Sequence, residues 1–429
     1  MLAPSPLYSN VTRSKGAGVE NINAGDTAWM LISTALVMLM TPGLAFFYGG
    51  LVRRKNVLSI MMQCLILVGV ISIQWVLFGY SLAFGPDHGG IIGGLSWAGL
   101  HGVGVVPNPD YAATIPHLLF MLFQMMFAVI TPALIVGAFA ERMKFSAFLL
   151  FSILWATIVY DPMAHWVWGV GGMLRTLGAI DFAGGTVVHI NAGAAALAAA
   201  LVIGKRKGYP DTSPPHNLPF AILGAALLWF GWFGFNAGSA LSSGGLAVSA
   251  FASTHLAAGT AAVAWAAMDW IRTRRATALG TISGAVAGLV AITPASGYVT
   301  PLGALAIGAL AGLVCYASVM FMKGKLGYDD SLDAFGVHGI GGMLGALCTG
   351  LWATVAINPA GANGVFHGGG KLLLWQFIAV VGSFAYSFVL SLGLLKLVDR
   401  FIGLRVSPDQ ESIGLDLTQH SESAYTVVG

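Results

Sequence analysis

Long apolar runs alternate with short polar connections from about residue 28 to residue 398. Each run is close to the roughly 20 residues that a helix needs to cross the hydrocarbon core of a bilayer. An outer-membrane barrel would instead show alternating segments of about ten residues, and the sequence has no such series. The pattern predicts eleven membrane-spanning helices, near residues 28–49, 57–84, 114–140, 145–168, 187–204, 217–239, 247–271, 277–295, 299–322, 338–357 and 370–398.

Lysine and arginine fall on every second connection between these predicted spans. Sixteen of the 20 lie on one side, namely Arg53, Arg54, Lys55, Arg142, Lys144, Lys205, Arg206, Lys207, Arg272, Arg274, Arg275, Lys323, Lys325, Lys396, Arg400 and Arg405. The other side holds only Arg13, Lys15, Arg175 and Lys371. Cytoplasmic loops carry an excess of such residues, which predicts an N-terminus outside and a cytoplasmic C-terminus. The net charge of +3 therefore reflects topology and does not indicate nucleic-acid binding.

Composition supports the same class of protein. Only 9% of the residues are charged and 57% are hydrophobic, whereas soluble domains carry about 25% charged residues. The chain is therefore expected to be an all-α, multi-pass protein whose partner is the lipid bilayer of a cell membrane. The middles of the spans contain essentially no acid or base, which argues against a pump with a buried carboxylate relay. An uncharged lumen suits a small neutral molecule.

Two stretches of the chain resemble each other: DFAGGTVVHINAGAAAL from Asp181 and DSLDAFGVHGIGGMLGAL from Asp330. In each, an Asp precedes a His by eight residues and a Gly follows that His by four. His189 begins the fifth predicted span and His338 the tenth, so the two helices run in opposite directions. This spacing predicts an inverted repeat, five plus five spans with an eleventh added, and such repeats place substrate sites at their interface.

The repeat also divides the chain into domains. We expect an extracytoplasmic tail over residues 1–27, a transmembrane domain over 28–399 and a cytoplasmic tail over 400–429. Within the transmembrane domain, repeat one covers about 28–204, repeat two about 217–357 and the eleventh span about 370–398.

The two histidines have several possible roles. Two neutral imidazoles from antiparallel repeats can share an N–H···N hydrogen bond, whereas two cationic ones would repel each other. Alternatively, each histidine braces its own helix. A metal site lacks a third ligand, so we expect neither a metal nor a cofactor. The spans contain no nucleophile–base pair, which argues against an enzyme.

Several motifs together identify a resemblance. DFAGGTVVHINAGAAALAAALVIGKR at 181–206 is similar to the signature of the ammonium transporter (Amt/Mep/Rh) family, and in particular to its bacterial-type Amt branch. The supporting motifs are GDTAWMLISTALVMLMTPGLAFFYGGLVRRKN at 25–56, IVGAFAERMKFSA at 135–147, AHWVWGVGGML at 164–174, PPHNLP at 214–219, GWFGFNAGSA at 231–240, FGVHGIGGMLG at 335–345 and GLRVSPDQESIGLDLTQHSESAY at 403–425. The resemblance implies an eleven-helix protomer in a homotrimer, with one pore per protomer.

The resemblance also implies the site residues. They are the pore-lining pair His189 and His338, the aromatic residues Phe127 and Trp168 of an outer ammonium site, the hydroxyl partner Ser239, the gate residue Phe235 that stacks on Phe127, and the motif acid Asp181. For Asp181 we favour a structural role, in which its carboxylate accepts backbone N–H groups before a helix, over direct deprotonation of ammonium.

The implied function is ammonium transport. Ammonium is recruited outside, deprotonated, and passed as ammonia, with or without its proton, to the cytoplasm. An ammonium sensor that acts through a cytoplasmic partner with little flux is the alternative, and a PII-type signal protein is the implied regulatory partner. Trp168 and Ser239 argue against a gas channel of the Rh type.

Two positions depart from the family pattern. Asp161, in IVYDPMAHW, is expected outside near Trp168, where it would raise the local cation concentration. Ser421, in HSESAY, replaces a glycine and is expected to constrain a turn that needs positive φ, which weakens the case for tail docking.

Overall fold

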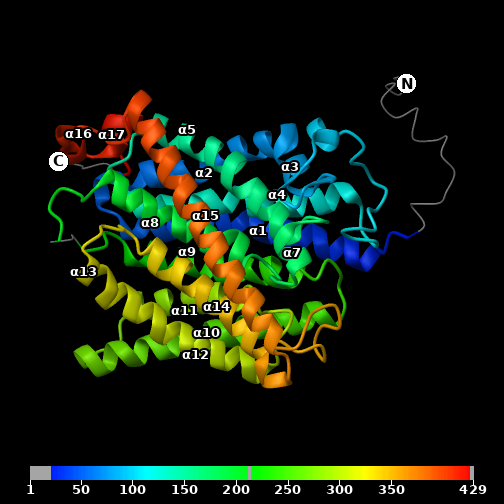
Figure 1. Cartoon of the computed structure of the whole chain (residues 1–429). Coiled ribbons are helices and arrows are strands. Elements are labelled where there is room, and N and C mark those ends of the chain that lie inside the picture. Colours follow the sequence, from blue (N-terminus) through cyan, green and yellow to red (C-terminus); the bar gives the residue numbers. More distant parts are fainter. Residues whose placement is uncertain (1–20, 211–213, 426–429) are drawn as a thin grey trace, which may run out of the picture.

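Long helices lie side by side across the molecule, and the computed structural model describes residues 21–210 and 214–425 (Figure 1). The first half contains α1 (Ala24–Leu51), η1 (Arg54–Asn56), α2 (Val57–Gln74), η2 (Trp75–Gly79), α3 (Tyr80–Phe84), η3 (Leu95–Leu100), α4 (His117–Phe139), α5 (Phe145–Trp155), η4 (Ala156–Tyr160), α6 (Asp161–Trp168), α7 (Met173–Leu177), η5 (Gly185–Ile190) and α8 (Asn191–Ile203). A small antiparallel hairpin, β1 (Asp87–His88) and β2 (Ile92–Gly93), follows α3.

The second half is also helical. It contains α9 (Leu218–Gly238), α10 (Gly245–Thr273), α11 (Ala278–Ile292), α12 (Pro301–Ala317), η6 (Ser318–Met322), α13 (Lys323–Leu326), η7 (Phe335–Gly339), α14 (Ile340–Trp352), η8 (Val365–His367), α15 (Gly370–Ile402), α16 (Pro408–Ile413) and α17 (Leu415–His420). The long helix α15 crosses the face seen in Figure 1, and α16 and α17 lie at one end of the molecule.

Ten continuous helical stretches within the described residues are long and apolar enough to cross a membrane. Helices suit this task because their backbone hydrogen bonds are satisfied within the segment. The predicted all-α membrane fold is therefore confirmed. The predicted span at 277–295 corresponds to α11, a shorter apolar helix of 15 residues. The count of eleven crossings stays a prediction.

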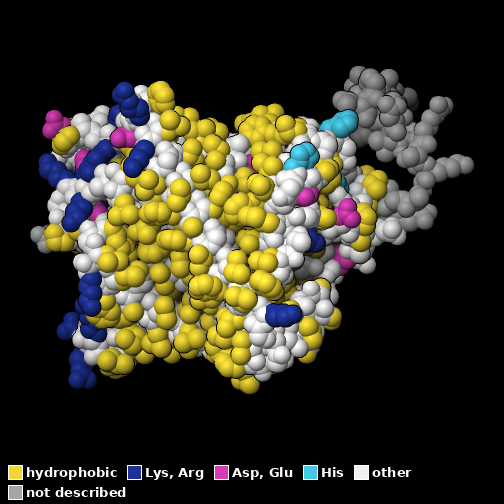
Figure 2. All heavy atoms as spheres, viewed as in Figure 1, with side chains coloured by type: hydrophobic (Ala, Val, Ile, Leu, Met, Phe, Trp, Pro, Cys, Tyr) yellow, Lys and Arg dark blue, Asp and Glu magenta, His cyan; other side chains and the backbone are white. Residues whose placement is uncertain are grey.

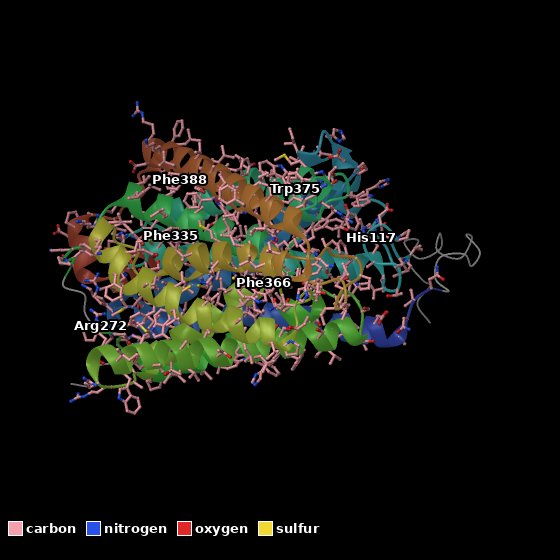
Figure 3. The ribbon with its side chains drawn as sticks, turned by 60° about the horizontal axis from the view of Figure 1, so that its bottom comes forward. His117, Arg272, Phe335, Phe366, Trp375 and Phe388 are labelled. Atoms are coloured by element: carbon pink, nitrogen blue, oxygen red, sulfur yellow. The ribbon has the colours of Figure 1, made fainter. Side chains whose placement is uncertain are left out.

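The charged side chains gather at the ends of the molecule. In Figure 2, most lysines and arginines lie at the end that carries α16 and α17, and a broad apolar band separates it from the opposite end. We call these the basic end and the outer end. Figure 3 shows Arg272 near the basic end and His117, the first residue of α4, near the outer end. This segregation matches the alternation of basic connections in the sequence.

Small residues allow three helices of the second half to pack closely. A Cβ atom added at Gly288 of α11 would lie 2.5 Å from the Ala257 carbonyl oxygen of α10, and one at Gly312 of α12 would lie 2.7 Å from the Ala261 carbonyl oxygen. Membrane helices associate through such small residues because lipid offers no hydrophobic driving force between helices. The glycines and alanines of this region therefore fix the spacing of α10, α11 and α12.

The two histidine-bearing segments are built in the same way. The Asp181 carboxylate accepts the N–H groups of residues 184–187 at 2.7–3.3 Å, at the start of η5. The Asp330 carboxylate accepts those of Ala334 and Phe335 at 3.1 and 2.7 Å, at the start of η7. Both segments are π-helical turns, a form common at functional sites. The predicted repeat thus recurs as one local structure.

The glycines that follow the two histidines hold the repeats together. A Cβ atom on Gly193 would overlap the Cα and N atoms of Gly339 in the other repeat. A Cβ atom on Gly342 would lie 2.9 Å from the Gly185 carbonyl oxygen and 3.0 Å from the His189 Cβ atom. Each glycine therefore gives the other repeat room to approach, which explains its fixed distance from the histidine.

The chain after α15 lies against the loops of the basic end. The Asp416 carboxylate accepts the Ser59 N–H at 2.8 Å, and Asn56 Oδ1 accepts the Leu415 N–H at 2.8 Å. The Glu411 carboxylate accepts the Lys207 N–H at 2.7 Å. Burial raises the pKa of Glu411, but this hydrogen bond and Arg405 outweigh burial, so its pKa is lowered.

Ser421 ends α17 with a φ of 56°, the left-handed conformation that the sequence predicted for this turn. Tail docking persists despite the missing glycine. Because a left-handed conformation costs an L-residue about 1–2 kcal/mol, we expect Ser421→Gly to tighten docking by about 1 kcal/mol. Slower proteolysis of the tail in detergent would show this. Faster cleavage in Ser421→Gly than in the parent protein would contradict it.

Candidate functional site

Three cavities follow one another between the two ends of the molecule. The outer cavity, about 590 Å³, is lined by residues that include Phe127, Trp168, Asp181 and Ser239. The central cavity, about 10 Å³, is lined by residues that include His189, Trp232, Phe235 and His338. The inner cavity, about 420 Å³, is lined by residues that include Phe47, Arg206, Lys323, Asp333 and His338. The structure thus distributes all seven site residues predicted from the sequence between the outer and central cavities.

The cavities also show the direction of the two repeats. Asp181, just before η5, lines the outer cavity, whereas Asp333, just before η7, lines the inner cavity. The two π-helical turns therefore start from opposite ends of the molecule. This is the antiparallel arrangement that the odd number of predicted spans between His189 and His338 required.

Two phenylalanines separate the outer cavity from the central cavity. The rings of Phe127 from α4 and Phe235 from α9 have centroids 4.3 Å apart, at 35° to each other. Both residues are only 1% exposed, so the two rings close the passage in this structure. Phe235 thus contacts Phe127 as the sequence predicted, but the two rings are tilted and do not stack in parallel.

Trp168 and Ser239 stand on the outer side of this pair. The Trp168 ring meets Phe127 edge-on, with centroids 5.8 Å apart, and its Nε1–H donates to the Asp181 carbonyl oxygen at 3.0 Å. The Ser239 hydroxyl, directly after α9, donates to the Phe235 carbonyl oxygen at 2.8 Å. Its oxygen lone pairs stay available to an N–H donor in the cavity.

The Asp181 carboxylate already accepts four backbone N–H groups, so it offers little capacity to a ligand. It also holds the loop whose carbonyl orients Trp168. This geometry fits the structural role that the sequence favoured for Asp181.

The two histidines meet in the central cavity. Their Nδ1 atoms are 3.3 Å apart and their rings are stacked, with centroids 5.3 Å apart. One Nδ1 must donate and the other accept, which is possible only if at least one ring is neutral. His189 Nε2 is buried and has no hydrogen-bond partner among the residues that the structure describes. The pair thus keeps a polar atom free in an otherwise apolar space.

Sequence reasoning missed Trp232. Its ring stacks on His189 with centroids 5.4 Å apart, and its Nε1–H donates to the Thr293 hydroxyl at 2.9 Å. Trp232 therefore fixes the plane of the His189 ring. The signal was present in GWFGFNAG, because Trp232 precedes Phe235 by three residues and so shares its face of α9.

The expectation for Asp161 was wrong. Asp161 is 0% exposed and does not line the outer cavity. The helix continues without a break from Phe145 to Trp168, which places Asp161 about two turns inside it. There its Oδ2 accepts the Gln74 Nε2–H at 2.7 Å. A side chain from another helix thus meets the carboxyl group, and the group has no access to the mouth.

This position predicts that Asp161→Asn leaves the apparent ammonium affinity unchanged at low salt. Asparagine keeps a carbonyl oxygen that can accept from Gln74. Asp110→Asn, at an exposed residue that does line the outer cavity, gives the size of a true charge effect at the mouth. Titrations of transport rate at two salt concentrations compare the variants. A salt-sensitive loss of affinity in Asp161→Asn would contradict this.

Ion pairs connect the loops beside the inner cavity, which Arg206 lines. Arg206 Nη2 pairs with Asp329 at 2.9 Å, and the fully buried Arg142 donates to the Asp329 carbonyl oxygen at 2.5 Å. Burial lowers the pKa of Arg142 to about 10. Burial raises the pKa of Asp329, but the hydrogen bonds and charge of Arg206 and the charge of Arg142 outweigh burial, so this pKa is lowered below its usual value. The pairs tie the loop after α8 to the loop before η7.

Comparisons with known proteins agree with this geometry. The sequence model of the Ammonium Transporter Family matches residues 28–425. The chain belongs to the ammonium transporter family. This family member is 55% identical over 401 residues to the ammonium transporter of Bacillus subtilis, covering 94% of this chain and 98% of the relative. It is 50% identical to ammonium transporter Amt1 of Archaeoglobus fulgidus, covering 94% and 99%.

Solved structures show the same fold in other family members. Candida albicans Mep2 superposes with a TM-score of 0.87 at 36% identity, covering 96% of this chain and 94% of that one. A structure named Sensor Amt Protein gives a TM-score of 0.84 at 32% identity, covering 92% and 98%. The family resemblance read from the sequence motifs is confirmed.

Proposed function

We propose that this chain carries ammonium across a cell membrane by recruiting the ion in the outer cavity and passing ammonia through the central cavity. The observation that carries the proposal is the order of the cavities. An open aromatic vestibule, a closed phenylalanine pair, a histidine pair and a second open vestibule follow one another between the outer end and the basic end.

The outer cavity suits a small cation. Moving a bare ion into hydrocarbon costs tens of kcal/mol, so it must be recognised before it loses its water. The rings of Trp168 and Phe127 each offer about 0.5–2 kcal/mol of cation–π attraction. Ser239 accepts one N–H of ammonium, an interaction that potassium lacks because it has no directional donors.

The central cavity suits a neutral molecule. Its volume of about 10 Å³ is close to that needed by one water-sized molecule, and ammonia is of that size. Its walls are apolar apart from the two imidazoles. Ammonium therefore transfers a proton to the free His189 Nε2 on entry, and ammonia remains as the species that passes. The free His189 Nε2 and the His189–His338 hydrogen bond provide a polar step and a route for that proton.

Assembly and orientation complete the proposal. The basic end is cytoplasmic by the positive-inside rule, so the outer cavity opens outside the cell. The chain forms a homotrimer with one pore per protomer, as the family resemblance implies. The docked α16 and α17 at the basic end are placed for regulation by a PII-type signal protein. The cavity series favours flux over the sensor alternative.

The test is an ammonium concentration jump on reconstituted protein on a solid-supported membrane, with vesicle pH followed in parallel. A transient current supports transport of charge, and a pH change without current supports passage of neutral ammonia. A potassium jump serves as the control and should give no current. Silence in both assays would reject the transporter and favour the sensor.

A further inference from the structure

His165 of α6 has an oxygen atom in front of each ring nitrogen. Its Nδ1 lies 3.0 Å from the Ala83 carbonyl oxygen in the last turn of α3, and its Nε2 lies 2.9 Å from Asp87 Oδ1 of β1. A backbone carbonyl and an ionised carboxylate only accept hydrogen bonds, so both ring nitrogens must carry a proton. The geometry therefore fits an imidazolium paired with a carboxylate. Without the extra proton, one nitrogen lone pair would face an oxygen lone pair.

Asp87 gives the buried ring a counter-charge and access to water. His165 is 0% exposed, whereas the Asp87 side chain is 32% exposed. The hydrogen bonds from His165 and from the Gly90 N–H outweigh burial and lower the pKa of Asp87 below its usual value. The carboxylate therefore stays ionised over the range of about pH 5 to 8 in which histidine side chains change charge. The exposed side of Asp87 lets the shared proton exchange with the outer solution.

This contact joins two parts of the wall of the outer cavity. Phe84 directly follows Ala83 and lines that cavity. Trp168 lies one turn after His165 at the end of α6 and lines the same cavity. α3 and α7, which precede the hairpin and follow α6, lie together near the outer end (Figure 1). The position of the last turn of α6 therefore decides where the Trp168 ring stands.

Two further hydrogen bonds hold the β1–β2 hairpin against the end of α6. Trp166 Nε1–H donates to the Ile91 carbonyl oxygen at 2.8 Å, and the Met173 N–H donates to the Gly90 carbonyl oxygen at 3.0 Å. Indole and backbone groups do not titrate near neutral pH. The histidine–carboxylate pair is therefore the titratable one among these three contacts.

The other titratable groups near α6 have different partners or none. Asp161, one turn before His165, accepts from Gln74. The elements packed against α6 carry the titratable or charged side chains Tyr80, His88, His117, Tyr160, Arg175, His189 and Tyr386. Within the described part of the chain, none of these forms a hydrogen bond or an ion pair with His165. The shared proton therefore depends mainly on His165 and Asp87.

We propose that His165 is a pH-sensitive positioning residue of the ammonium site, because the proton that it shares with Asp87 fixes the end of α6 that carries Trp168. This rests on the proposed function. While the proton is present, the pair clamps α6 to the hairpin. When the proton leaves at higher pH, the bare nitrogen and the carboxylate repel each other, and the Trp168 ring is held less firmly for cation–π contact. The affinity for ammonium therefore falls as the external pH rises.

The measurement is the ammonium concentration that gives half-maximal current in proteoliposomes, taken at about pH 6 and about pH 8 on both sides of the membrane. Ammonium keeps its own proton at both values. The parent should need about fivefold more ammonium at the higher pH, since hydrogen bonds between charged groups are the stronger ones. In Asp87→Asn the amide can donate to a neutral His165, so the two concentrations should agree within about twofold.

His101→Gln is the matched control, because His101 is an exposed histidine of the same outer connection, directly after η3. This variant should keep the parental ratio of the two concentrations.

His165→Gln covers the case in which Asp87→Asn fails to fold. The glutamine amide can donate to Asp87 but does not titrate, so this variant should also lose the pH dependence. A parental ratio within about twofold of one would overturn the inference, as would an unchanged ratio in a folded Asp87→Asn or His165→Gln protein. Absence of current in the parent at both pH values would instead reject the proposed function, which keeps the two failures distinct.

Discussion

We expect the His189→Ala/His338→Ala variant to lose at least nine-tenths of the ammonium-driven current while it still folds. The two imidazoles are the polar side chains of an apolar central cavity, and His189 Nε2 has no partner there among the described residues. Without them ammonia loses a hydrogen bond at the narrowest point, and a hydrogen bond contributes about 0.5–1.5 kcal/mol. Loss of the proton route adds to this effect on current.

The measurement compares peak current on a solid-supported membrane after the same ammonium jump. His255→Ala is the matched control, because His255 is exposed on α10 and lies outside the three cavities. It should retain the parental current. A double variant that conducts as much charge as the parent would remove the histidine pair from the mechanism. A pH change that survives without current would assign the pair to the proton alone.

The second large effect is expected from Gly193→Ala. The added methyl group would overlap the Gly339 backbone, so η7 must move away from α8. Overpacking of a well-packed core costs about 1–3 kcal/mol, and here the neighbour is backbone, which cannot rotate away. The displacement also shifts His338, one residue before Gly339. Both thermal stability and current should therefore fall together.

Gly259→Ala provides the comparison. Gly259 lies inside α10, and an added Cβ atom meets nothing within 4 Å. Alanine is the better helix former by about 1 kcal/mol, so this variant should be neutral or slightly stabilised. Thermal unfolding in detergent, followed by tryptophan fluorescence, measures both variants. Equal melting temperatures for Gly193→Ala and the parent would show that the repeats do not pack as tightly as described.

Periodic features of this fold were predictable from the sequence. Span lengths follow from bilayer thickness, and the basic connections follow from membrane topology. The histidine pair was predictable because its repeat carries an Asp, a His and a Gly at the same spacing in both halves. In the structure, each Asp accepts N–H groups at the start of its own helical segment, and each Gly packs against the segment of the other repeat.

Side-chain contacts between helices that are far apart in the sequence were not predictable in this way. The sequence placed Asp161 at the mouth because it lies near Trp168 along the chain. Its actual partner, Gln74, comes from another helix, and no spacing rule connects the two residues. The same holds for Trp232, whose contact with His189 joins two helices that are far apart in the sequence. The site depends on how faces of α4, α6 and α9 are turned toward one another.

The small central cavity separates selection by binding in the outer cavity from selection by size during passage. Under the proposed function, the outer cavity selects substrates by charge and by the geometry of their N–H donors, and its volume of about 590 Å³ accommodates ions larger than ammonium. The central cavity admits one water-sized body between closely packed rings. A methylated amine can therefore occupy the first and block it while crossing the second slowly. The binding affinity of a cation then depends on its charge, and its transport rate depends on its size. A strong competitor of ammonium is therefore not necessarily transported well.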